Sequence, residues 1–121
     1  PLQVVGPHTL AAVHSTMANV DWLKEAFPHR LAIHPADADA RGIRDGDRVK
    51  VFNSRGAVFV ACRITRRIRP GVVALPQGAW WTPGPSGADE NGSINVLTSG
   101  RATALAFANA QHTIMAQVVK A

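Results

Sequence analysis

The chain has 121 residues, of which 46% are hydrophobic and 17% charged, and its net charge is +5. This length suits a single domain, and the lack of a long apolar run argues against a bilayer-spanning helix. The only cysteine, Cys62, argues against a disulfide framework and a thiolate-rich metal site. We therefore expect one soluble domain over residues 1–121, with enough positive charge to attract nucleic acid, anionic lipid or a phosphorylated cofactor.

The first third of the chain predicts short elements joined by a long loop. Residues 2–5 are apolar and favour a strand, and residues 30–33 favour a second one. Between them, apolar side chains recur at helical spacing over residues 19–27, where Asn19 is a candidate N-cap. Pro28 should end that helix because proline lacks the next backbone donor.

The middle of the chain predicts a small helix followed by a hairpin. Pro35 suits a first helical turn, and Gly42 suits the left-handed position after the helix. Apolar and polar residues then alternate over 48–52 and 57–64, with a turn at residues 53–56. This alternation places Val58, Val60 and Cys62 on one face of the second strand.

The last part predicts further short segments around a long loop. Residues 72–75 and 113–119 favour strands, residues 94–97 are short and apolar, and residues 102–109 favour a helical turn. Residues 77–93 form the longest loop, and long loops of compact domains are usually functional or disordered. The whole pattern predicts a mainly β fold with small helices, closed as a β-barrel.

A candidate anion site lies in the loop before the first helix. His14, Ser15 and Thr16 are followed closely by Asn19, so hydroxyls and free backbone amides could converge on a phosphate oxygen. An ordinary helix cap beside an exposed histidine is the structural alternative on spacing alone.

Candidate contacts for an aromatic ligand lie further along the chain. Gly78 permits close backbone approach, and Trp80 offers a flat apolar surface with one donor, although it could equally cover the core. Two polar groups could hydrogen-bond to the edge of a guanine or pterin, or could simply form turns. One consists of Asn95 and Thr98, and the other of Asn109 and His112.

Other chemistries have weaker support in the sequence. The histidines lack paired ligand spacing, and no G-x-S-x-G nucleophile elbow is present. Gly92-Ser93 could be the self-cleaving bond of a pyruvoyl enzyme on a related barrel. A basic nucleic-acid-binding β-barrel is the main alternative function, with its arginines clustered over residues 63–69 but few lysines and no interleaved aromatics.

The segments HSTMANVDWLKEAF, IHPADADARGIRDGDRVKVFNSRGAV, IRPGVVALPQGAWW, SINVLTS and NAQHT occur in an order and spacing that resemble the C-terminal domain of the dimethyl sulfoxide reductase family. The resemblance covers most of the chain and is greatest to the catalytic subunits of anaerobic dimethyl sulfoxide reductases. It implies a double-psi β-barrel, of the aspartate decarboxylase-like kind, that binds a bis(molybdopterin guanine dinucleotide) cofactor and is not catalytic alone.

The resemblance also implies what surrounds this domain. Most of the molybdenum site and any iron-sulfur cluster would lie elsewhere in a longer catalytic subunit, so no residue here is expected to be catalytic or to bind the metal. The partners would be the other domains, an iron-sulfur electron-transfer subunit and a membrane anchor subunit. A twin-arginine signal on the full chain would place the enzyme on the periplasmic face of the bacterial inner membrane.

Residue by residue, the resemblance assigns cofactor contacts to three regions. His14, Ser15 and Thr16 match a loop near the pterin and phosphates, with Asn19 following, and Asn95 matches an asparagine at the dinucleotide. Asn109 and His112 match a last polar cluster by the pterin. The segment RATALAFANAQHT departs from the family because it carries alanines where relatives have proline or glycine, so the last loop is the least certain part of the match.

Overall fold

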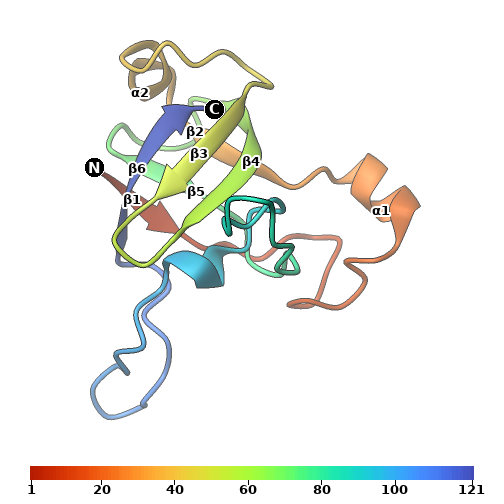
Figure 1. The fold of residues 1–121 in the computed structure, drawn as a ribbon, viewed down its shortest axis with the longest axis vertical. Helices are drawn as coiled ribbons and strands as arrows, with labels where there is room; N and C mark the ends of the chain where they lie inside the picture. Colours follow the sequence, from red (N-terminus) through yellow and green to blue (C-terminus); the bar gives the residue numbers. More distant parts are fainter.

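A computed structural model describes residues 1–121 and contains a closed six-stranded barrel with the strand order β1-β5-β2-β4-β3-β6 (Figure 1). Small helices and long loops connect the strands. The strands are β1 (Leu2–Val5), β2 (Arg30–Ile33), β3 (Arg48–Phe52), β4 (Ala57–Ile64), β5 (Val72–Ala74) and β6 (Ile114–Lys120), and the helices are α1 (Asp21–Ala26), α2 (Pro35–Asp39) and the 3-10 helix η1 (Ile94–Leu97).

The barrel interior is filled by the alternate side chains of its strands. Val49 and Val51 of β3 are fully buried, and so is Val58, which pairs with Val51 across the β3-β4 hairpin. Cys62 is buried on the same face, as the alternation predicts, and its thiol donates to the Arg44 carbonyl. Since neighbouring residues of a strand point to opposite faces, this register places every second residue in one apolar core.

The topology combines parallel and antiparallel neighbours. β1 pairs in parallel with β5, and β2 pairs in parallel with β4, while the other four pairings are antiparallel. The closed mainly β barrel with few small helices confirms the predicted double-psi class of fold. Closure of the barrel leaves no free sheet edge, so a ligand site is expected among the loops at the two ends of the barrel.

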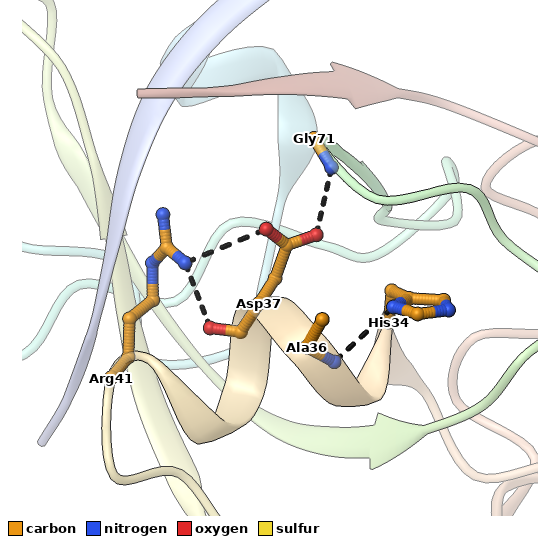
Figure 2. Close-up of polar contacts among 5 residues, drawn as sticks. All are labelled: His34, Ala36, Asp37, Arg41 and Gly71. Carbon is orange, nitrogen blue, oxygen red and sulfur yellow. Dashed lines mark hydrogen bonds and ion pairs between the residues drawn. The ribbon is translucent and has the colours of Figure 1, made fainter.

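Helix α2 is attached to the barrel by polar contacts of its first turn (Figure 2). The His34 Nδ1 accepts from the amide of Ala36, which caps the helix. The Asp37 Oδ2 accepts from the Gly71 amide at 2.8 Å, and the Arg41 Nη1 donates to the Asp37 carbonyl at 2.7 Å. The Asp37–Gly71 bond holds the helix against the turn that precedes β5, and the other two bonds stabilise the helix itself.

Two local predictions are wrong. Helix α1 begins at Asp21 with Val20 at its N-cap and no side-chain cap bond, so Asn19 does not cap it. Residues 102–109 contain no helix; Ala102 and Asn109 form an antiparallel bridge across a loop that the Thr103 hydroxyl braces by accepting from the Ala108 amide. Both errors fall in segments without buried residues, where local propensity has little packing to enforce it.

Candidate functional site

The loops that follow the parallel strands β1 and β5 leave the barrel together at one end. Beyond the strands, the Leu75 amide donates to the Val5 carbonyl and the Gln77 amide donates to the Pro7 carbonyl. In Figure 1 the long loops and η1 gather at this end, while α2 lies at the other. Carboxyl ends of parallel strands are a frequent place for ligand sites because their loops diverge there.

The predicted loop residues His14 and Ser15 lie directly against Gly78 and Trp80. The Trp80 Nε1 donates to the Ser15 carbonyl at 2.8 Å. A Cβ built on Gly78 would lie 2.1 Å from the His14 carbonyl oxygen, so only glycine allows this approach. Trp80 therefore supports the loop through this hydrogen bond. The sequence had suggested only a flat surface for a ligand or a cover for the core.

The loop itself has an uncommon backbone. His14 has a φ of 52° and lies with its ring 5.0 Å from that of His8, edge to face. The hydroxyl of Thr16 donates to the Val13 carbonyl at 2.6 Å, closing a tight turn. His14, Ser15 and Thr16 are all exposed, while the Thr16 amide donates within the turn to the Val13 carbonyl.

A second polar group gathers where β6 begins. The Gln111 Nε2 donates to the Asn95 Oδ1 at 3.3 Å. The His112 Nδ1 accepts from the Gly6 amide at 3.3 Å, so its ring is held at the end of β1. These contacts join the segment before β6 to η1 and β1.

This second group borders a cleft of about 560 Å³. The candidate cofactor residues Asn95, Thr98 and Asn109 line it, whereas His112 is not part of the lining. Sequence reasoning did not identify Arg101, the one charged residue of the lining, because a single arginine in a loop carries no motif. The lining residues are Asn95, Thr98, Ser99, Gly100, Arg101, Ala102, Phe107, Ala108, Asn109 and Gln111.

The predicted residues thus form two groups at one end of the barrel, and Asn19 belongs to neither. Asn19 is exposed before α1, with no side-chain hydrogen bond to either group. The groups are connected through the chain that leaves β1, since Gly6 bonds to His112 and His8 packs on His14. Their cofactor roles remain predictions.

A buried carboxylate organises the long loop between the two groups. Asp89 is fully buried, and its side chain accepts from the backbone amides of Thr82, Asn91 and Ser93 at 2.6–3.3 Å. The Gly92 carbonyl accepts from the His29 Nε2 at 3.1 Å, and burial lowers the pKa of His29, while that hydrogen bond and the Asp89 charge oppose the shift.

The Gly92-Ser93 dipeptide is part of this loop framework. Ser93 is buried, and its amide is one of the three that Asp89 binds. The left-handed φ of Gly92, 72°, fits the turn at this point. These contacts give the dipeptide a structural role.

The lining chemistry fits a nucleotide-like, phosphorylated ligand. Amide side chains pair with purine or pterin edges, hydroxyls and an arginine bind phosphate oxygens, and the volume lies within the range of small-molecule sites. No three His, Cys, Asp or Glu side chains lie together as a metal site would require. No helix is long and apolar enough to cross a bilayer. The fold and cleft together define a β-barrel domain of the ligand-binding kind.

Comparison with known proteins identifies the family. The model of the "Molydopterin dinucleotide binding domain" family matches residues 2–115. The chain belongs to this family and is a molybdopterin dinucleotide-binding domain. This membership supports the cofactor interpretation and gives no support to the nucleic-acid alternative.

Similar proteins are longer than this chain. Dimethyl sulfoxide reductase DmsA of Escherichia coli is 48% identical over 120 residues, covering 99% of this chain and 15% of its own length. A trimethylamine-N-oxide reductase of Haemophilus influenzae is 38% identical over 130 residues, covering 99% and 16%. Acetylene hydratase from Pelobacter acetylenicus has the same fold, with a TM-score of 0.82, 18% identity, and coverage of 100% of this chain and 18% of its own.

Proposed function

We propose that this chain is one domain of the catalytic subunit of a molybdenum oxidoreductase that reduces S-oxides or N-oxides, and that it holds part of a bis(molybdopterin guanine dinucleotide) cofactor. The observation that carries the proposal is the polar cleft at one end of a barrel that the family model matches over residues 2–115. Relatives named as dimethyl sulfoxide and trimethylamine-N-oxide reductases support the reaction class.

In this proposal the chain's own residues bind and orient the cofactor. The amides of Asn95 and Asn109 pair with guanine or pterin edges, while Arg101 binds phosphate oxygens. The Thr98 hydroxyl donates to the Asn95 carbonyl and so positions the cleft segment. The exposed His14 loop supplies an imidazole near the chain that leaves β1. When bound, the molybdenum and its pterins supply the oxygen-atom and electron transfer.

The test uses the full-length catalytic chain made in a host that synthesises the cofactor. We expect molybdenum and guanine nucleotide in stoichiometric amounts after denaturation, together with reduction of dimethyl sulfoxide or trimethylamine N-oxide by a reduced viologen. Asn95→Ala should lower the cofactor content, whereas Gln117→Ala, on an exposed position of β6, should not. A chain that holds neither molybdenum nor guanine nucleotide would overturn the proposal.

We further propose that the full enzyme works with an iron-sulfur electron-transfer subunit and a membrane anchor subunit on the periplasmic face of the inner membrane. The support is the similarity to the reductase chains named above. Affinity purification of the tagged full chain from membranes, with protease accessibility in spheroplasts, tests both statements. Recovery of the full chain alone in the cytoplasm would refute them.

A further inference from the structure

Two segments that project from the barrel expose large apolar side chains. We call residues 7–28 the arm and residues 101–110 the tip. No arm or tip residue is buried. Leu10 is 100% exposed, Leu105 is 95% exposed, and Phe107, Trp22 and Met17 are each more than half exposed. In Figure 1 both segments extend away from the barrel.

The same segments hold bulky residues in an unfavourable backbone conformation. Met17, Leu105 and Phe107 have φ values of 64°, 67° and 50°. Side chains with a Cβ disfavour this left-handed region, so such residues persist where surrounding contacts determine the conformation. Within the 121 residues, little packs on these side chains. The conformation therefore indicates contacts made outside them.

We propose that the arm and the tip form a seam against the part of the catalytic chain that lies outside these 121 residues, and that their apolar side chains are buried there. The proposal rests on the proposed function, because it requires the longer chain. The length of that further polypeptide is indicated by the relatives, because this chain matches only 15% of the length of dimethyl sulfoxide reductase DmsA.

The cofactor is a poorer match for this surface than protein is. The lining of the cleft is mostly polar, and of the seven exposed large apolar residues in the arm and the tip only Phe107 belongs to it. Leu10, Trp22 and Met17 lie outside the cleft, where a charged dinucleotide would gain little from them. Burying apolar side chains of this size against protein is favourable in proportion to the area covered.

The chain offers a matched pair of probes for the seam. Its methionines are Met17 in the arm, 53% exposed, and Met115 on β6, 50% exposed. In the isolated 121-residue chain, hydrogen peroxide would oxidise these two methionines at similar rates. In the full chain, with and without cofactor, we expect hydrogen peroxide to convert Met17 to its sulfoxide at least fivefold more slowly than Met115. A Val119→Met variant supplies a second reference on the outer face of β6.

A substitution at Leu10 tests the same seam independently. Leu10 is fully exposed here, so Leu10→Gln removes little contact within these residues. In the full chain it should accelerate Met17 oxidation several-fold, whereas Val119→Gln should not. Equal oxidation rates of Met17 and both reference methionines would overturn the proposal. Protection of Met17 that appears only with cofactor bound, or only in a complex with another polypeptide, would also overturn it. Molybdenum and guanine measured in the same samples report separately on the proposed function.

Discussion

The indole Nε1 of Trp80 donates to the backbone carbonyl of Ser15 at 2.8 Å, across 65 residues of sequence. This bond joins the loop after β5 to the loop after β1, so the position of one predicted cofactor segment depends on the other. Trp80 therefore has a supporting role that is independent of any contact with a ligand.

Replacing Trp80 by phenylalanine should weaken cofactor retention while keeping the aromatic surface. A net hydrogen bond contributes about 0.5–1.5 kcal/mol, so we expect roughly a 2- to 10-fold loss of affinity in the full chain. Trp81→Phe is the control because Trp81 is exposed and donates no side-chain hydrogen bond. Guanine nucleotide retained after dialysis is the measurement, and equal losses in the two variants would contradict the supporting role.

Gly78→Ala should displace the His14 loop. The added Cβ would lie 2.1 Å from the His14 carbonyl oxygen, and the φ of 103° adds strain. Gly87→Ala is the matched control because Gly87 also has a positive φ, 76°, but nothing lies within 4 Å of its Cβ. We expect urea unfolding of the 121-residue chain to show a further loss of about 1–3 kcal/mol for the Gly78 variant. Equal losses would mean that the close approach is unimportant.

Asp89→Ala should destabilise the loop of residues 77–93. The variant would leave the three amides that Asp89 binds without their acceptor, and of these bonds the one from Ser93 is fully buried while the other two are partly buried. A buried amide costs about 1–3 kcal/mol when unsatisfied and a partly exposed one less, so a total loss of about 3 kcal/mol is expected. Asp39→Ala, at an exposed carboxylate near the end of α2, provides the comparison in the same urea titration. A loss no greater than that of the control would refute the bracing role.

His29 should make the domain less stable in mild acid. Burial lowers its pKa in the folded state below the ordinary value of 6.5, so the unfolded chain takes up the proton first as the pH falls. The free energy of unfolding should therefore decrease from about pH 6.5 downward and level off below the folded-state pKa.

His29→Gln keeps a donor for the Gly92 carbonyl and removes this titration. We expect a flatter dependence of the urea midpoint on pH between about 7 and 5 in the His29→Gln chain than in the parent chain. Identical slopes in the parent and His29→Gln chains would show that another group is responsible.

Local patterns were sufficient for most of the barrel. Residues 2–5, 30–33, 48–52 and 57–64 were predicted as strands with their observed bounds. The alternation of apolar and polar residues predicts these strands correctly because each strand buries one face in the core. The turn chemistry of Pro35 and Gly42 likewise located α2.

The arm and the tip were harder to predict. Asn19 had the right residue type for a cap and residues 102–109 had helix-favouring alanines, yet neither prediction held. These segments bury no residue within the chain, so their conformation depends on distant contacts such as the Trp80 bond to Ser15. Propensity over a few residues is too weak to determine such a structure.

The sequence by itself determined the strands, the apolar core and the resemblance that led to the family, because these depend on periodicity and on ordered motifs along the chain. Only the tertiary structure decided that Gly78 and Trp80 support the His14 loop, that Arg101 joins Asn95 and Asn109 around one cleft, and that Asp89 organises the intervening loop. The contacts of Gly78 and Trp80 with the His14 loop join residues far apart in sequence, and the parallel pairing of β1 with β5 brings them together. The Asp89 contacts and the cleft arise within shorter stretches of chain, from loop conformations that no periodic pattern predicts.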